Sequence, residues 1–215
     1  MIDIEGFILI GGESKRMGVE KAALRLPKPN QKRFIDLIAA ALRPVVKNVR
    51  VVSRRPETEN YGFTMVTDRV TDRVTDRVTD RFAGGGALVG LHAALYHSES
   101  AWVAVVACDM PFVTHDLFKV LIDHIEDNCE DNDAIVPMQN DGLMQPLCAL
   151  YRKEGCLKQA KSLIRTGDRS AQSLIMSVKT CLVSFEELMI AGDAARWLTN
   201  INTPEDYKRE LRNTV

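Results

Sequence analysis

Residues 102–112 read WVAVVACDMPF, and this stretch indicates the class of fold. Its apolar residues follow one another without a polar break, which is typical of a strand buried on both faces of a sheet. Asp109 lies at the carboxyl end of this strand, and Pro111 shapes the turn that leaves it. Ligands of open α/β sheets bind beyond the carboxyl ends of the strands, so Asp109 is a candidate functional residue.

Strands and helices alternate along the rest of the chain. Further strands are expected at GFILIGG (6–12), NVRVVS (48–53), GFTMV (62–66), DAIVPM (133–138) and PLCALYR (146–152). Helices are expected at 31–46, 86–98, 114–127, 156–167 and 202–211. The pattern predicts a single α/β domain, Rossmann-like, with a mostly parallel sheet and helices on both faces. The strands at 133–138 and 146–152 are candidates to pair with each other.

Three helix ends carry recognisable capping residues. Thr114 is the expected N-cap of the helix that follows the buried strand. Gly167 is a suitable C-cap for the helix before it. The last helix begins with Thr203 as N-cap, Pro204 at its first position and Asp206 at its third.

Composition excludes several classes of protein. The 215 residues carry 28 basic and 29 acidic side chains, which argues against nucleic-acid or anionic-membrane binding. The five cysteines are odd in number and contain no C-x-x-C pair, which favours reduced thiols. Asp3 and Glu5 stand where a signal peptide would be basic, and no apolar stretch reaches membrane-spanning length. A cytoplasmic protein is expected.

The first motif with chemical meaning is LIGGESKRMGVEK, residues 9–21. Gly11 and Gly12 allow backbone N–H groups to approach an anion, and Arg16 and Lys21 can neutralise phosphate charge. It matches neither a Walker loop nor the dinucleotide fingerprint G-x-G-x-x-G. Taken alone, it also fits an ordinary glycine-rich turn with two solvated cations.

Asp109 in ACDMPF is the second motif. A carboxylate at this place can hold Mg²⁺ against nucleotide phosphates, because Mg²⁺ takes one or two carboxylates together with phosphate oxygens. The simpler alternative is a strand-terminal Asp that makes a turn or capping bond. Cys108 is interpreted as a packing residue. The four histidines (His92, His97, His115 and His124) are interpreted as structural or surface residues.

Together, GG-x-S-x-R-M-G-x-E-K and CDMPF resemble the nucleotidyltransferase superfamily, and most closely the molybdenum cofactor guanylyltransferases. GGGALVGLHAAL (84–95), QPLCALYR (145–152) and NINTPEDY (200–207) extend the resemblance over nearly the whole chain. The resemblance implies a fold of the nucleotide-diphospho-sugar transferase type. It also implies transfer of GMP from GTP to molybdopterin, with release of pyrophosphate. The acceptor is a phosphate monoester that is largely dianionic at neutral pH, so no general base is needed.

The resemblance also implies roles for individual residues. Leu9, Ile10, Gly11 and Gly12 would line the nucleotide pocket. Lys21 and Arg16 would balance triphosphate charge, and Asp109 would bind Mg²⁺. Asn200 and Asn202 match the asparagines that the family places on the pterin side, although they can also simply shape the turn before the last helix. Transient contacts with other cofactor-biosynthesis proteins or acceptor molybdoenzymes are expected.

Some positions depart from the family pattern. Glu20 replaces the usual Asp, Ile10 the usual Ala, and Ala87 the proline of the glycine loop. These changes weaken the assignment of guanine as the base. A cytidylyltransferase, a sugar-nucleotide pyrophosphorylase and a non-catalytic nucleotide-binding protein on the same fold therefore stay open as alternatives.

Residues 66–81 repeat VTDR four times. As a strand, the repeat has no apolar face, and as a helix it stacks like charges at i,i+4. Relatives place one nucleotide-contacting Asp between the third strand and the glycine loop. Counting forward from the strand gives Asp68, and counting back from the loop gives Asp80, the preferred of the two. The repeat is therefore interpreted as an in-frame expansion of one VTDR unit within a single domain, 1–215.

Deleting residues 66–77, so that Met65 joins Val78, removes three of the four copies. We expect the deletion variant to keep its nucleotidyl-transfer activity, because it restores one Asp at the ancestral distance from both flanks. Pyrophosphate release measured beside the full chain tests this. Loss of activity would contradict the expansion hypothesis.

Overall fold

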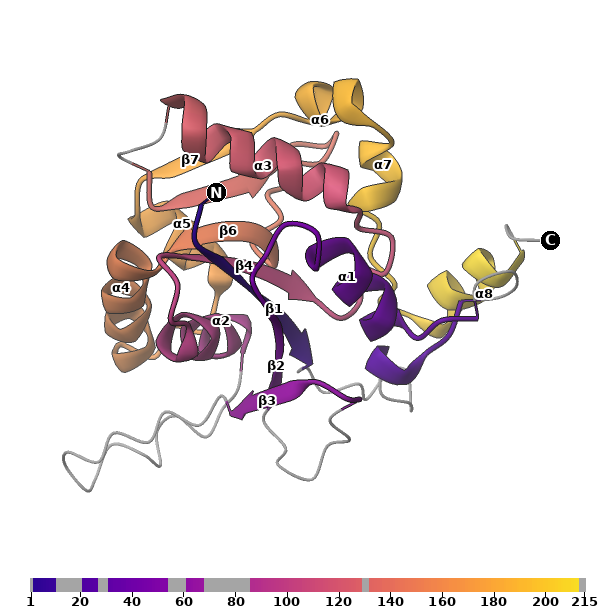
Figure 1. Cartoon of the computed structure of the whole chain (residues 1–215), viewed down its shortest axis with the longest axis horizontal. Coiled ribbons are helices and arrows are strands. Elements are labelled where there is room, and N and C mark those ends of the chain that lie inside the picture. The colour runs from indigo at the N-terminus through magenta and orange to yellow at the C-terminus, as the bar shows by residue number, and fades with distance from the viewer. Residues whose placement is uncertain are drawn as a thin grey trace.

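The sheet follows the order β3-β2-β1-β4-β6-β5-β7 in the computed structural model, which describes residues 2–10, 21–26, 31–53, 61–67, 86–128 and 132–212 (Figure 1). Its strands are β1 Ile4–Ile10, β2 Val49–Ser53, β3 Thr64–Thr67, β4 Trp102–Ala107, β5 Ala134–Pro137, β6 Cys148–Arg152 and β7 Thr180–Val183. β1 pairs in parallel with β2 and β4, and β2 pairs in parallel with β3. The mostly parallel sheet predicted from the sequence is confirmed.

β6 is the exception to the parallel pattern. It runs antiparallel to both β4 and β5, while β7 is parallel to β5. The pairing of Ala134 with Tyr151 and of Ile135 with Leu150 confirms that the segments 133–138 and 146–152 lie side by side.

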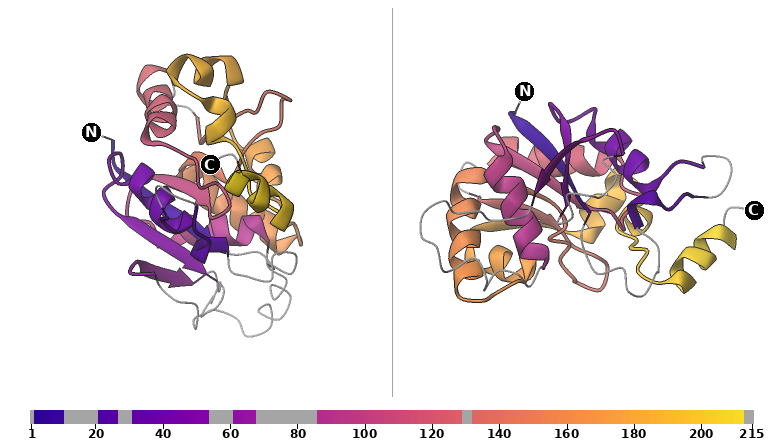
Figure 2. Two further views of the ribbon diagram at one scale, coloured as in Figure 1. Left: turned by 90° about the vertical axis from the view of Figure 1, so that its right-hand side faces the viewer. Right: turned by 90° about the horizontal axis from the view of Figure 1, so that it is seen from below.

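Helices cover both faces of the sheet (Figures 1 and 2). They are η2 Lys21–Ala23, α1 Phe34–Leu42, α2 Ala87–His97, α3 His115–Asn128, α4 Lys153–Arg165, α5 Ala171–Ser177, α6 Phe185–Ala191, α7 Ala194–Trp197 and α8 Pro204–Arg212. Every helix expected from the sequence is present, whereas η2, α5, α6, α7 and β7 were not anticipated. Among the described helices, none is both long and apolar enough to cross a membrane.

The core has two halves, one on each side of the sheet. α1 and α3 pack on one half, together with Ala104 and Val106 of β4. α2, α4 and α5 pack on the other half, with Val103 and Val105. Successive side chains of a strand point to opposite faces, so β4 is buried on both sides, as its continuous apolar run predicts.

The capping predictions have mixed outcomes. The start of α8 is capped as expected: the Asp206 N–H donates to Thr203 Oγ1 at 3.1 Å, and the Thr203 N–H donates to Asp206 Oδ2 at 2.9 Å. Gly167 follows α4 with a φ of 94°, which suits a glycine C-cap. Thr114 lies directly before α3, at the predicted N-cap position, but its hydroxyl is buried without a hydrogen-bond partner among the described residues, so the capping bond is not made.

Glu5 of β1 is a buried carboxylate that joins the first strand to the start of β4. Its Oε2 accepts hydrogen bonds from Ser98 Oγ at 2.8 Å and from the Glu99 N–H at 2.7 Å. Arg50 Nη1 lies 3.8 Å from its other oxygen. Burial opposes the charge, but these hydrogen bonds and Arg50 outweigh it, so the pKa of Glu5 is lowered.

We expect Glu5→Gln to lower the free energy of unfolding by about 1–3 kcal/mol at pH 7, since it removes hydrogen bonds to a charged acceptor. A lowered folded-state pKa stabilises the protein above about 4.5, the ordinary value of a glutamate, and this contribution is lost as pH falls through the folded-state value. Urea unfolding at pH 7 and at acid pH measures both effects. The variant should lose less stability than the wild type on acidification, and an equal loss would contradict this role.

Candidate active site

The pairing of β1 with β4 brings two of the predicted motifs to one edge of the sheet. Leu9 is the register partner of Ala107, and the Cys108 N–H donates to the Leu9 carbonyl at 3.2 Å. The chain therefore leaves β1 towards residues 11–21 at the same edge where Asp109 follows β4. This is the carboxyl edge at which open parallel sheets bind their ligands.

Lys21 connects this edge to the far end of the chain. Its Nζ lies 3.3 Å from Asp109 Oδ2 and donates to Asn202 Oδ1 at 2.9 Å. The Lys21 and Asp109 side chains are only 16% and 23% exposed, so their charges interact in a partly desolvated setting. Three residues that the sequence singled out separately are in contact.

The segment that carries Asn202 is held in place by its backbone. The Ile201 N–H donates to the Asp109 carbonyl at 2.8 Å. The Asn202 N–H donates to Asp206 Oδ2 at 3.1 Å, so the residues that cap α8 also orient Asn202. Burial opposes the charge of Asp206, but hydrogen bonds from Thr203 and Asn202 outweigh it and lower its pKa. The cap therefore stays ionised at neutral pH.

Asn200 has an unmet hydrogen-bonding group. Its Oδ1 is buried and lacks a hydrogen-bond partner within the described part of the chain. A buried acceptor in this state carries a desolvation cost that a donor would relieve. It lies two residues from Asn202, in the segment that reaches Asp109.

Leu9 and Ile10 lie at the site through their backbone, not their side chains. Both side chains are 6% exposed, and they pack into opposite halves of the core. The expected contact of these residues with a nucleotide stays a prediction about main-chain groups. The other expected binding residues, Gly11, Gly12, Arg16, Asp68 and Asp80, lie outside the described residues.

The described side chains can hold a hard cation such as Mg²⁺ only together with further ligands. No group of three or more His, Cys, Asp or Glu side chains close enough to bind a metal occurs among the residues described. Asp109 offers a single carboxylate beside a cationic amine. That arrangement fits Mg²⁺ held by one carboxylate, phosphate oxygens and water, and does not fit a metal cage built from protein alone.

Two supporting contacts were missed by the sequence analysis. Gln139, in the loop between β5 and β6, donates from Nε2 to the Leu198 carbonyl at 3.1 Å. Tyr207 of α8 donates from its hydroxyl to the Arg25 carbonyl at 2.6 Å. Both brace the segment around Asn200 and Asn202, and neither has a local sequence pattern that reports a partner so far along the chain.

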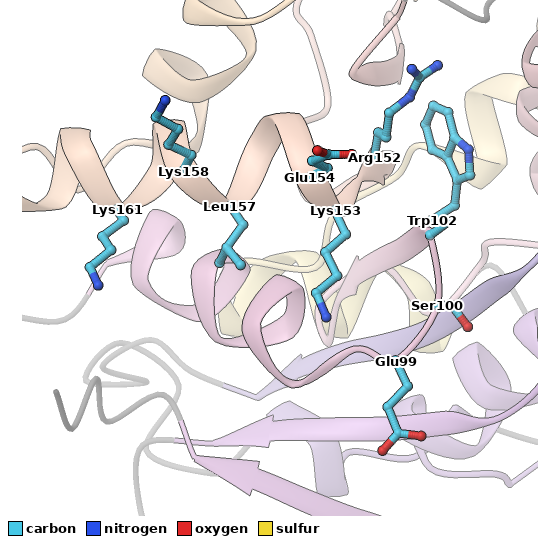
Figure 3. Close-up of a pocket in the computed structure, with 10 residues that line it drawn as sticks. Glu99, Ser100, Trp102, Arg152, Lys153, Glu154, Leu157, Lys158 and Lys161 are labelled. Atoms are coloured by element: carbon cyan, nitrogen blue, oxygen red, sulfur yellow. The ribbon is translucent and has the colours of Figure 1, made fainter. Parts of the chain in front are cut away.

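A cavity of about 890 Å³ lies at the opposite edge of the sheet, where β4 begins and β6 ends (Figure 3). The charged ends of Arg152, Lys153 and Lys158 point in different directions around it. Arg152 lies over the Trp102 ring at 5.3 Å, and Lys153 donates to the Ser98 carbonyl. The residues that line this cavity therefore do not present a converging set of polar groups.

Ala87, where the family pattern led us to expect proline, begins α2. It occupies the first helical position, directly after Gly86. Proline is favoured at this position because it lacks a backbone N–H, and an N–H in the first turn has no acceptor within the helix. The substitution leaves the helix in place.

Comparisons with known proteins show which family the chain resembles. Residues 6–181 match the model of the MobA-like NTP transferase domain. A protein of Pelotomaculum thermopropionicum named "Probable molybdenum cofactor guanylyltransferase" is 34% identical over 96% of this chain and 91% of its own. Molybdopterin-guanine dinucleotide biosynthesis protein A of Archaeoglobus fulgidus has the same fold, with a TM-score of 0.77 at 24% identity over 98% of both chains.

The fold is shared more widely than the sequence. The 2-C-methyl-D-erythritol 4-phosphate cytidylyltransferase of Thermus thermophilus superimposes with a TM-score of 0.66 at 16% identity, over 99% of this chain and 98% of that one. The fold is therefore that of the nucleotide-diphospho-sugar transferase type, as the sequence predicted. The length of the match to the family model and the 34% identity decide the family: the chain belongs to the MobA-like NTP transferases and, among them, to the molybdenum cofactor guanylyltransferases, a group of nucleotidyltransferases.

Proposed function

We propose that this protein transfers GMP from GTP to molybdopterin, releasing pyrophosphate and forming molybdopterin guanine dinucleotide. The observation that carries the proposal is the contact of Lys21 with both Asp109 and Asn202 at the carboxyl edge of the sheet. A cation, a carboxylate and an amide from three distant segments meet there, as a reaction between two anionic phosphates requires. The name of the 34% identical relative supports the choice of substrates.

Lys21 is the proposed electrostatic centre of the reaction. The acceptor is a phosphate monoester, largely dianionic at neutral pH, so it attacks without a general base. The main obstacle is repulsion between this dianion and the triphosphate. The Lys21 ammonium is partly buried and already positioned, so it reduces this repulsion with little reorganisation. Arg16 is proposed to act beside it.

Asp109 is proposed to hold Mg²⁺ together with phosphate oxygens. The bound ion would supply charge neutralisation of the triphosphate and of the departing pyrophosphate. In the structure, Asp109 Oδ2 faces Lys21, so the ion pair holds this carboxylate in place. The hydrogen bond from the Ile201 N–H to the Asp109 carbonyl positions the backbone of the same residue.

Asn202 and Asn200 are proposed to bind the pterin side. The Oδ1 of Asn202 accepts a hydrogen bond from Lys21, so its amide NH₂ group is the part that would donate to a substrate. Asn200 carries the buried, unmet Oδ1 acceptor. Amide donors and acceptors match the hydrogen-bonding edge of a pterin ring. Because Lys21 contacts Asn202 directly, it links the nucleotide side to the acceptor side.

The remaining expectations complete the proposal. Main-chain groups of Leu9 to Gly12 would line the nucleotide pocket, and Asp80 or Asp68 would contact the nucleotide. The protein would work in the cytoplasm and meet other cofactor-biosynthesis proteins or acceptor molybdoenzymes transiently.

Asp109→Asn and Lys21→Met test the roles of the two charges. We expect each to lower kcat by about 100-fold or more, the usual effect of removing one preorganised electrostatic group. Single-turnover pyrophosphate release with GTP, Mg²⁺ and molybdopterin measures the loss. Asp141→Asn and Lys32→Met, which change exposed residues, are the matched controls and should keep full activity.

Unchanged turnover in Asp109→Asn would overturn the metal assignment. Absence of pyrophosphate release by the wild type would instead favour a non-catalytic nucleotide-binding protein. Thermal melting of both variants distinguishes a loss of catalysis from misfolding. We expect both variants to keep the wild-type melting temperature within a few degrees. The partly exposed ion pair that they lose contributes about 1 kcal/mol or less, and the sheet core stays intact.

GTP and CTP compared as donors test the identity of the base. We expect pyrophosphate release with GTP at a kcat/KM at least tenfold above that with CTP, using molybdopterin as the acceptor. A preference for CTP would make the protein a cytidylyltransferase on the same fold. Release with a sugar 1-phosphate but not with molybdopterin would instead indicate a sugar-nucleotide pyrophosphorylase.

A further inference from the structure

A cysteine, a histidine and a glutamate form a chain of contacts near the surface, outside the candidate active site. Cys181 Sγ is 3.8 Å from His124 Nδ1, and His124 Nε2 is 2.6 Å from Glu187 Oε1. The three residues come from β7, α3 and α6. This order of thiol, imidazole and carboxylate resembles, in geometry alone, the arrangement that activates a nucleophilic sulfur.

The carboxylate determines which imidazole nitrogen carries the proton. An ionised carboxylate only accepts hydrogen bonds, so Nε2 of His124 must donate to Glu187. In the neutral imidazole, the lone pair then lies on Nδ1, which is the nitrogen that faces the sulfur. The Cys181 thiol therefore has a proton acceptor rather than a second donor beside it.

The elements around the cluster hold its geometry. Ser184 caps α6 by accepting the Glu187 N–H at 3.2 Å, which fixes the first turn of the helix that carries the carboxylate. α3 packs against α6, and β7 is hydrogen-bonded to β5 within the sheet. The side chain of His124 is 24% exposed, that of Glu187 is 46% exposed, and Cys181 itself is partly exposed, so the cluster is open to solvent.

The other described cysteines lie in different environments. Cys108, Cys148 and Cys156 are buried. Burial raises the pKa of Cys148 to about 12 and also raises that of Cys156. Cys181 is partly exposed and contacts an imidazole, whereas Cys148 and Cys156 are kept as thiols. Nucleotidyl transfer at Lys21 and Asp109 does not use this cluster.

We propose that Cys181 is a modification site at which a thiol activated by His124 exchanges with small disulfides. The S–H proton passes to His124 Nδ1 as the sulfur attacks one sulfur of R–S–S–R. A Cys181–S–S–R bond forms, the R–S⁻ group leaves, and it takes the proton from Nδ1. Glu187 orients the imidazole and stabilises its charged form, so it is a positioning residue.

The test uses the reduced full chain and glutathione disulfide at pH 7. Peptide mapping by mass spectrometry follows glutathione on Cys181 over time and resolves it from the other cysteines, Cys129 included. We expect Cys181 to react about tenfold faster than N-acetylcysteine, of which only a few per cent is thiolate at this pH. His124→Gln should lower the rate about tenfold, and Glu187→Gln about threefold.

Two matched controls are available on the same helices. His115→Gln and Glu186→Gln make the same chemical changes away from the sulfur, and each should leave the rate of Cys181 unchanged. A wild-type rate no higher than that of N-acetylcysteine would overturn the proposal. So would a rate in His124→Gln equal to that in His115→Gln. If circular dichroism shows His124→Gln to be unfolded, Glu187→Gln decides, because it changes a largely exposed side chain.

Discussion

The parallel pairing of β1 with β4 is the constraint on which the rest of the structure depends. Both strands are buried on both faces, so their side chains alternate between two apolar layers. A shift of register by one residue would move every side chain of a strand into the opposite layer, where it would not fit its neighbours. The fixed register sets Leu9 opposite Ala107. The groups at the candidate active site are positioned relative to this pair. Lys21, in η2, follows β1 along the chain, and Asp109 follows β4.

Most of the fold could be predicted from the sequence, because long periodic segments carry their own signal. β4 is recognised by its continuous apolar run, and α3 and α8 are long enough for the helical spacing of their residues to show. β7 and α7 have four residues each, so little pattern is available. β5 is as short as β7, but all four of its residues are buried, whereas Leu182 of β7 is 44% exposed. Thr114 follows the capping rule in its residue type, but burial leaves its hydroxyl without the expected hydrogen bond.

The candidate site was predicted as separate residues, and its connections were not. Lys21, Asp109 and Asn202 each lie in a motif that can be recognised locally. The contact of Lys21 with Asn202 spans 181 positions, and no local pattern reports such a distance. Asp206 illustrates the same limit: its place at the third position of α8 predicts a cap, whereas its second role, orienting the Asn202 backbone, follows only from the turn that precedes the helix.

The contact of α8 with the first part of the chain has a consequence for the order of folding. Tyr207 donates a hydrogen bond to the carbonyl of Arg25, and its ring meets that of Phe34 edge-on at 6.1 Å. A contact between residues so far apart in sequence closes a long loop, and the entropic cost of that closure must be met before the contact can stabilise the chain. We therefore expect the Asn202 side of the site to form after the strands of the sheet have paired. Folding of the core and completion of the site are then separate events.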